Sequence, residues 1–281
     1  MRLLVLGLLG LAGCSYYEQP RFTSDQRLGG VTVSAATLNR GAAGFMRACR
    51  PCHGALGDGR GPQAVGMDPP PRDLRLGVVS YASVPAGSLW RDEDVIRIVR
   101  SGLAGTGMRA WTEVPDDELV AIVQFVKTLS PRFRDERPGD PITASPDPWV
   151  GRETDGAARG RVVYHGLGRC QSCHPAYASL AEVQAFARDA GVQIEPRPHP
   201  DQPAEVRSDF GRTLRATDFR AGPLRAVRPG SRAQDLYRAI AAGLGGTAMP
   251  TWKGALAEAD LWALVHYVDA LDRGQDVATA P

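Results

Sequence analysis

Apolar residues recur with a helical period in two segments that lie far apart in the chain, residues 116–130 and 258–272. In both segments they are spaced three and four residues apart, so they share one face of a helix. In the first segment these residues are Leu119, Ile122, Val123 and Val126. In the second they are Leu261, Leu264, Val265 and Val268. Each segment is therefore expected to form an amphipathic helix that buries this face.

The residues before these two helices also match, at an offset of 141 positions. EDVIRIVRSGLAGTGMRAW (93–111) aligns in this way with QDLYRAIAAGLGGTAMPTW (234–252). The identical pairs are Asp94 and Asp235, Gly102 and Gly243, Leu103 and Leu244, Thr106 and Thr247, Met108 and Met249, and Trp111 and Trp252. Such a repeat of spacing and residue type predicts a duplicated domain.

Each copy also carries a Cys-x-x-Cys-His motif, which runs from Cys49 to His53 in the first and from Cys170 to His174 in the second. The motif alone is compatible with covalent haem attachment, a zinc site or a redox disulfide. A structural zinc site needs four nitrogen or sulfur ligands, and each copy offers three nearby. A thioredoxin-like motif needs a βαβ setting, whereas the flanking pattern here is helical. Two copies in duplicated helical domains therefore favour haem, bound by the thiols and ligated by the imidazole.

Each half resembles a class I cytochrome c. A glycine and an aromatic residue stand four positions apart before each motif, Gly41 with Phe45 and Gly160 with Tyr164, and GALGDGRGP (54–62) resembles the glycine-rich loop that follows the motif in this family. The resemblance implies an all-α fold of two tandem cytochrome c-like domains, each a small helical fold wrapped around a covalently bound haem.

The same resemblance implies how each domain is assembled. It covers about residues 35–130, cytochrome c domain 1, and 155–273, cytochrome c domain 2. In each, the first helix would pack against the last, where Phe125 and Tyr267 are expected to receive the aromatic residue of the first helix.

The resemblance further implies the residues that hold two haem c groups and their iron. The thioether bonds would be made by Cys49, Cys52, Cys170 and Cys173. His53 and His174 would bind iron from one side, with Met108 and Met249 on the opposite side. A thioether sulfur is a soft, neutral ligand that favours ferrous iron and raises the reduction potential.

Three further side chains enter these expectations. Met67 is a rival to Met108 for the first iron, but it has no counterpart in the second half. The carbonyl of Pro62 is expected to accept the imidazole N–H of His53, a contact that fixes the orientation of the ring. The second half has no such Gly-Pro loop, so the partner of His174 is open. His165 is expected on the surface.

The amino terminus has the features of an exported lipoprotein. Residues 1–13 contain Arg2 and an apolar run that is shorter than the about 20 residues needed to span a bilayer, and they fit a signal peptide. The run ends in Leu-Ala-Gly before Cys14, which resembles the bacterial lipoprotein signal and predicts lipid attachment there. Ser15, in place of aspartate, favours the inner leaflet of the outer membrane over the inner membrane. Polar residues 14–34 are expected to form a flexible tether.

The remaining segments are a linker, an insertion and a tail. Residues 131–154 are rich in proline, glycine and charge, which indicates a linker, although Trp149 suggests that it packs against a domain. The second domain contains an insertion at about 176–214, in which LAEVQAFARDAG predicts one extra helix; partner docking and simple drift both remain open as its origin. Residues 274–281 form a tail.

Composition adds little to this picture. A formal net charge of +2 in 281 residues gives no reason to expect a nucleic-acid partner. Two irons with both axial positions filled favour an electron carrier over an enzyme. The sequence therefore predicts a membrane-anchored dihaem c-type cytochrome that passes single electrons between redox partner proteins outside the cytoplasmic membrane. The alternatives are a haem-bearing subunit of a membrane oxidoreductase complex and a dihaem peroxidase.

Overall fold

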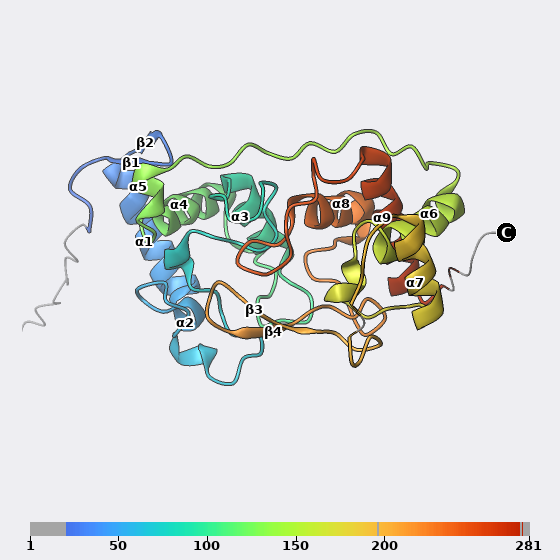
Figure 1. Cartoon of the computed structure of the whole chain (residues 1–281). Coiled ribbons are helices and arrows are strands. Elements are labelled where there is room, and N and C mark those ends of the chain that lie inside the picture. The colour runs from blue at the N-terminus through green and yellow to red at the C-terminus, as the bar shows by residue number, and fades with distance from the viewer. Residues whose placement is uncertain (1–20, 196, 276, 278–281) are drawn as a thin grey trace, which may run out of the picture.

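The computed structural model describes residues 21–195, 197–275 and 277. This part of the chain is mainly helical and carries only two small two-stranded sheets (Figure 1). The α-helices are α1 Ala35–Ala48, α2 Arg50–His53, α3 Asp92–Ser101, α4 Asp116–Lys127, α5 Arg132–Asp135, α6 Glu153–His165, α7 Leu180–Asp189, α8 Arg232–Ala242 and α9 Glu258–Asp272. The strands are β1 Gln26–Leu28, β2 Val31–Val33, β3 Glu205–Arg207 and β4 Thr213–Arg215. Short 3-10 turns are η1 Pro62–Ala64, η2 Leu74–Leu76, η3 Cys170–Ser172 and η4 Pro229–Ser231.

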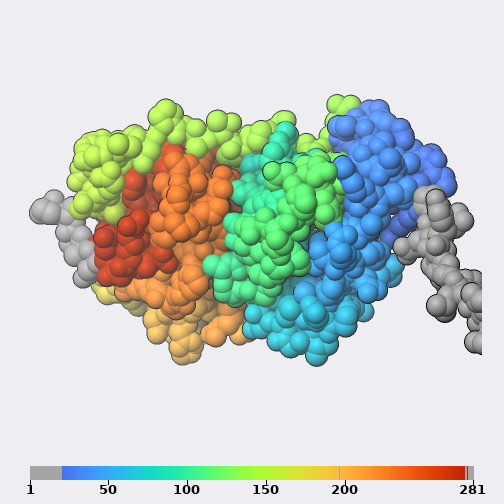
Figure 2. All heavy atoms as spheres, turned by 180° about the vertical axis from the view of Figure 1, so that it is seen from behind, coloured from blue at the N-terminus to red at the C-terminus, as the bar shows by residue number. Residues whose placement is uncertain are grey.

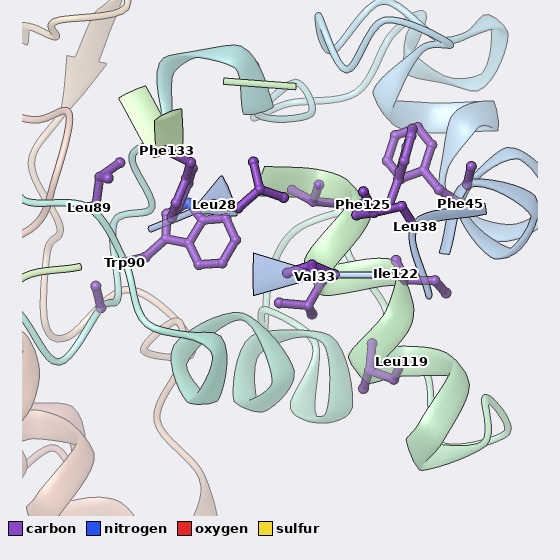
Figure 3. Close-up of a cluster of buried hydrophobic side chains, with 14 of the residues drawn as sticks. Leu28, Val33, Leu38, Phe45, Leu89, Trp90, Leu119, Ile122, Phe125 and Phe133 are labelled. Atoms are coloured by element: carbon purple, nitrogen blue, oxygen red, sulfur yellow. The ribbon is translucent and has the colours of Figure 1, made fainter. Parts of the chain in front are cut away.

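A close crossing of α1 and α4 organises the first half, residues 35–130. A Cβ atom on Gly41 would lie 2.0 Å from the carbonyl oxygen of Ala121, so only glycine lets the two backbones approach this closely. One turn later the rings of Phe45 and Phe125 pack with their centroids 5.2 Å apart. Figure 3 shows these two rings beside Leu38 in the buried cluster of this half. The expected contact between the first and last helices is therefore present.

The second half, residues 155–273, repeats this crossing with α6 and α9. A Cβ atom on Gly160 would lie 2.0 Å from the carbonyl oxygen of Ala263. The rings of Tyr164 and Tyr267 pack with their centroids 5.3 Å apart. The buried hydroxyl of Tyr164 has a hydrogen-bond partner, because it donates to the carbonyl of Pro175 at 2.8 Å.

A buried aspartate opens the helix before each glycine-rich loop. Asp94, in the first turn of α3, accepts hydrogen bonds from the backbone and hydroxyl of Ser83 and from Arg97. Asp235, its repeat equivalent in α8, accepts hydrogen bonds from Arg228 and Arg238. Both carboxylates are almost completely buried, and a buried carboxylate is tolerated because its oxygens are satisfied. The matched aspartates therefore tie the start of each helix to the preceding loop.

The segment before α1 differs from the expected flexible tether. Residues 26–33 form the β1–β2 hairpin, in which Gln26 pairs with Val33 and Leu28 with Val31. Leu28 and Val33 are buried in the core of the first half. The tether prediction is wrong for residues 26–33, because one buried apolar side chain from each strand docks the short hairpin on the core. Residues 14–20 of the predicted tether lie outside the described residues.

The linker, residues 131–154, packs along both halves. It runs along one edge of the molecule from α5 to α6, as Figure 1 shows in yellow-green. At its start Phe133 is fully buried against Trp90 in the first half, with ring centroids 4.6 Å apart. At its end the indole N–H of Trp149 donates to the carbonyl of Ala259, and Trp262 donates to the carbonyl of Ser145. The suggestion from Trp149 that this segment packs against a domain is confirmed.

The insertion, 176–214, contributes one helix and one hairpin. The predicted extra helix is present as α7, and its first turn carries a capping box between Ser179 and Glu182. The β3–β4 hairpin was not predicted; Val206 pairs with Leu214 in it. Three-residue strands with one apolar residue each give almost no period-two signal in the sequence.

The two halves are in direct contact. The hydroxyl of Ser80 donates a hydrogen bond to the carbonyl of Gly245 at 3.0 Å, and the backbone N–H of Ala86 donates to the carbonyl of Ala242 at 2.9 Å. Seen from behind in Figure 2, the blue-to-green half meets the orange-to-red half along a continuous boundary. Within the described residues, none of the helices combines the length and the apolar character needed to cross a bilayer.

The helix crossings predict a specific sensitivity to volume. Gly41→Ala and Gly160→Ala each insert a methyl group into backbone of the facing helix, so each is expected to lower the free energy of unfolding by roughly 1–3 kcal/mol or more. Chemical denaturation monitored by circular dichroism measures this loss. Gly230→Ala is the matched control, because a Cβ atom there meets nothing within 4 Å. Equal stability of all three variants would contradict the close approach.

Candidate functional site

The first Cys-x-x-Cys-His motif lies where α1 ends and α2 begins. Cys49 closes α1 with a backbone hydrogen bond to Phe45 and also stands at the start of α2. The backbone N–H of His53 donates a hydrogen bond to the carbonyl of Cys49 at 2.9 Å. One tight turn therefore carries both thiols and the imidazole, and both Cys49 and Cys52 are free thiols.

The second motif forms the same turn with a shorter helical element. The backbone N–H of His174 donates a hydrogen bond to the carbonyl of Cys170 at 2.9 Å, and residues Cys170–Ser172 form η3. Cys170 and Cys173 are also free thiols. The two motifs therefore present the same three side chains in the same local arrangement.

A backbone carbonyl accepts a hydrogen bond from each imidazole. Nδ1 of His53 lies 3.2 Å from the carbonyl oxygen of Arg72, and Nδ1 of His174 lies 2.8 Å from that of Thr217. In the described part of the chain, Nε2 of both rings has no hydrogen-bond partner, so it is the nitrogen left to bind iron. The carbonyl also selects the tautomer with hydrogen on Nδ1.

The acceptor in the first half is a correction to the expectation that Pro62 would fill this role. Pro62 starts η1, and the loop between it and Arg72 turns the chain back toward His53. The acceptor in the second half, which the sequence left open, is Thr217. The signal that could have found both is a weak match between Arg72-Asp73-Leu74 and Thr217-Asp218-Phe219, in which the aspartate is identical and a large apolar residue follows it. It was hidden because the insertion changes its distance from the motif.

Burial shifts the pKa values of both imidazoles and of one thiol in each motif. Burial lowers the pKa of His53 and of His174, opposed in part by the hydrogen bond to the carbonyl, so both rings stay neutral near pH 7. A neutral imidazole is the form that ligates a metal. Burial raises the pKa of Cys49 and Cys170 to about 12, which keeps these two sulfurs as thiols. Thiols are the groups that add across the vinyl substituents of haem.

The two methionines lie in loops with the same hydrogen bonds. In the first loop the hydroxyl of Thr106 donates to the carbonyl of Leu103 at 2.8 Å and accepts from the backbone N–H of Met108 at 3.1 Å. In the second, Thr247 makes the corresponding bonds with Leu244 at 2.7 Å and with Met249 at 3.2 Å. Each threonine thus holds its methionine in a closed loop of fixed shape.

A glycine with positive φ starts each methionine loop. Gly102 ends α3 with φ of 66° and Gly243 ends α8 with φ of 72°. A Cβ atom on either glycine would also meet the backbone on the far side of the loop, at 2.6 Å from the nitrogen of Ala110 and at 2.4 Å from the carbonyl oxygen of Pro250. Both the turn and the close approach therefore require glycine.

The described residues bring Met67 close to the first loop. Its sulfur would lie 3.0 Å from a Cβ atom built on Gly107, next to Met108. Met67 and Met108 thus occupy one neighbourhood, and the choice of Met108 as the ligand of the first iron stays a prediction. So do the pairings of His53 with Met108 and of His174 with Met249. Cys14 lies outside the described residues.

His165 is a buried residue, in contrast to the surface position expected for it. Its ring is fully buried between Tyr164 and Phe186, with Nδ1 bonded to the carbonyl of Arg161 at 2.8 Å. Nε2 is buried with no hydrogen-bond partner in the described residues. The repeat alignment held the signal: Tyr164 matches Phe45, so His165 falls at the position of the packed residue Met46.

The residues present fit covalent haem in both halves. Each motif offers two free thiols and a neutral imidazole whose Nδ1 is already hydrogen-bonded to a carbonyl. Within 21–195 and 197–275, no three His, Cys, Asp or Glu side chains gather in a cluster able to hold a bare metal ion. The donor sets are therefore those of thioether attachment and one axial imidazole.

Comparison with known proteins agrees with this geometry. Residues 36–126 match the model of the family described as cytochrome C oxidase, cbb3-type, subunit III. The match supports a c-type cytochrome family, and a cytochrome c domain implies covalently bound haem c. No curated protein matches the chain.

A solved structure is similar over most of the chain. It is the reducing HAO-like protein complex Kustc0457/Kustc0458 of Kuenenia stuttgartiensis, to which the chain is 27% identical with a TM-score of 0.66, covering 83% of this chain and 95% of that one. Together with the cytochrome c domain, this similarity indicates an electron-transfer haem protein.

The buried imidazole of His165 predicts a pH dependence of stability. Burial lowers the pKa of His165 to about 4, from 6.5 in the unfolded chain. As pH falls through this window, the unfolded chain binds a proton that the folded chain does not, so the free energy of unfolding decreases by roughly 3 kcal/mol and levels off near pH 4. Denaturant titrations of the holoprotein between pH 7 and pH 4 measure it.

The control for this prediction is His165→Asn, whose amide replaces the Nδ1 donor to the carbonyl of Arg161 but does not titrate. It is expected to show a shallower dependence on pH over the same window. Parallel curves for the two proteins would show that His165 is not held neutral.

Proposed function

We propose that this protein is a dihaem c-type cytochrome that transfers single electrons between redox partner proteins outside the cytoplasmic membrane. The observation that carries the proposal is the duplicated site: two Cys-x-x-Cys-His turns, each with Nδ1 of its histidine on a backbone carbonyl, and two methionine loops closed by the same threonine bonds. When bound, haem iron supplies reversible exchange of one electron between its ferric and ferrous forms.

In this proposal the chain's own residues hold and tune the two haems. Cys49, Cys52, Cys170 and Cys173 attach them through thioether bonds. His53 and His174 bind iron through Nε2, and the carbonyls of Arg72 and Thr217 keep each ring in one orientation. The threonine-closed loops would offer the sulfurs of Met108 and Met249 as further iron ligands. With each iron held by these side chains, no coordination position would be left for a substrate, which favours electron transfer over catalysis.

The matched methionine loops weigh against a dihaem peroxidase. Such an enzyme needs one iron that can open a coordination position, which requires a missing or displaceable sixth ligand. The loops of Met108 and Met249 share the same hydrogen bonds, so neither is visibly specialised for opening. Their equal construction supports a carrier role for both haems.

A second candidate function is that of a haem-bearing subunit in an oxidoreductase complex. The observation that favours it is the similarity to a chain from the reducing HAO-like protein complex, with 95% of that chain covered. The chemistry of the haems would be the same in either case. A stable stoichiometric complex after gentle extraction would support the subunit, and a freely exchanging monomer would support the shuttle.

Membrane attachment is part of the proposal and rests on the sequence alone. The apolar run followed by Leu-Ala-Gly-Cys supports cleavage after Gly13 and lipid attachment at Cys14. An acyl anchor would keep the two haems near membrane-bound donors and acceptors, and so raise their effective concentration.

The haem content and ligation give the direct test. Pyridine haemochrome assay of the mature protein is expected to return two covalently bound haems per chain. Met108→Ala and Met249→Ala are each expected to remove about half of the sulfur-to-iron charge-transfer absorbance of the oxidised protein, because each removes one of two such ligands. Optical spectra at equal haem concentration measure the loss.

The control is Met67→Ala, which removes the neighbouring sulfur of the first half. It should leave the charge-transfer absorbance unchanged. Loss of the band in this variant, with the band retained in Met108→Ala, would reassign the ligand of the first iron. Fewer than two haems per chain would overturn the dihaem proposal.

The anchor has its own test. Cys14→Ala is expected to move the protein from the membrane fraction into the soluble periplasmic fraction, because it removes the only thiol that the signal presents for acylation. Detergent phase partitioning and intact mass of the mature protein measure the change, with haem content as the control for folding. An unaltered distribution and an unacylated wild-type mass would rule out the anchor.

A further inference from the structure

Arg72 contacts both halves of the molecule with opposite ends of one residue. Its carbonyl oxygen accepts the hydrogen bond from Nδ1 of His53, the expected iron ligand of the first half. Its guanidinium donates to the hydroxyl of Ser80 at 2.5 Å. Ser80 in turn donates to the carbonyl of Gly245 in the second methionine loop. A continuous series of bonds therefore runs from the first imidazole to the second methionine loop.

The insertion holds the guanidinium from the other side. The guanidinium carbon of Arg72 lies 3.9 Å from the centre of the Phe210 ring, which is a cation–π contact. Phe210 stands in the turn of the β3–β4 hairpin and lies against Gly246, where a Cβ atom would be 1.8 Å from the ring. The backbone N–H of Asp209 also donates to the carbonyl of Gly246. The turn is thus docked on the loop that carries Met249.

The positive charge of Arg72 has no carboxylate against it in the described residues. Its titratable neighbours are Tyr81, the imidazole of His53 and another cation, Arg212. Burial lowers the pKa of Arg72 to about 10, so the guanidinium remains protonated at neutral pH. A mostly buried charge without a counter-ion is costly, and its field is screened less than that of an exposed side chain. This placement therefore calls for an explanation beyond packing.

We propose that Arg72 is a positioning residue that couples the two haem sites: its charge raises the reduction potential of both irons, and its side chain fixes the carbonyl that orients His53. The inference rests on the proposed dihaem function. A fixed positive charge between two sites disfavours the ferric form at each, because that form carries one more positive charge. Because one charge acts on both irons, a change in that charge would shift both reduction potentials together.

This inference also gives the insertion a role that the sequence left open. The β3–β4 hairpin brings Phe210 across the boundary between the halves, where it covers the guanidinium. Without the ring, water would reach the charge and weaken its field at both sites. The hairpin is therefore an internal clamp on Arg72, which is a function distinct from docking a partner.

The test is a redox titration of the full-length mature holoprotein, followed optically and resolved into two midpoint potentials. Arg72→Met removes the charge and keeps a long apolar side chain, so both potentials are expected to fall. Arg72→Lys keeps the charge, and both potentials are expected to lie closer to those of the wild type. Arg60→Met is the matched control, since Arg60 is exposed and also follows His53 in the first half; it should change neither potential.

The outcomes separate this inference from the dihaem proposal. Fewer than two haems per wild-type chain would overturn both. Two haems with unchanged potentials in Arg72→Met, a fall at one haem only, or equal shifts in the methionine and lysine variants would overturn the coupling alone. Should Arg72→Met fail to mature, Phe210→Ala provides the second test: both potentials are expected to fall by a smaller amount, and their constancy would refute the clamp.

Discussion

The structure depends on the contact between two helix backbones in each half. Gly41 lies against the carbonyl of Ala121, and Gly160 lies against that of Ala263, at distances that no side chain permits. This crossing places the end of the first helix, and with it the Cys-x-x-Cys-His turn, at a fixed position relative to the last helix. The aromatic pairs one turn later, Phe45 with Phe125 and Tyr164 with Tyr267, lock the same crossing through burial.

In each half, hydrogen bonds to backbone groups hold the imidazole and the methionine loop in place. A carbonyl orients each imidazole, and a threonine bonded to backbone groups closes each methionine loop. The carbonyl contacts depend on the path of the chain and not on residue type, and the threonine is present in both copies, so the two halves keep the same site although the segments that supply the carbonyls differ in sequence. Thr217 fills in the second half the position that Arg72 fills in the first, and the side chain of Arg72 is free for a separate task.

The contact between the halves makes one unit of the duplicated chain. The linker is pinned at Phe133 and Trp149, and the loop around Ser80 is bonded to the second methionine loop. Two sites joined in this way have a fixed separation, in contrast to two domains on a flexible connection. A fixed separation suits a protein in which electrons pass between the sites, and it is what the proposed action of Arg72 on both sites requires.

The sequence by itself determined the main helices, the repeat and the two motifs, because these follow from short spacings that a helical period or a local turn makes visible. The pairing of the first and last helices followed from the resemblance to a class I cytochrome c. It also indicated that Trp149 packs the linker against a domain. The tertiary structure alone decided the acceptors Arg72 and Thr217, the burial of His165, the docking of residues 26–33 and the clamp by Phe210. Each of these joins segments far apart in the chain, or uses a backbone carbonyl that every residue carries, so it has at most a weak trace in the repeat alignment and none in a local pattern.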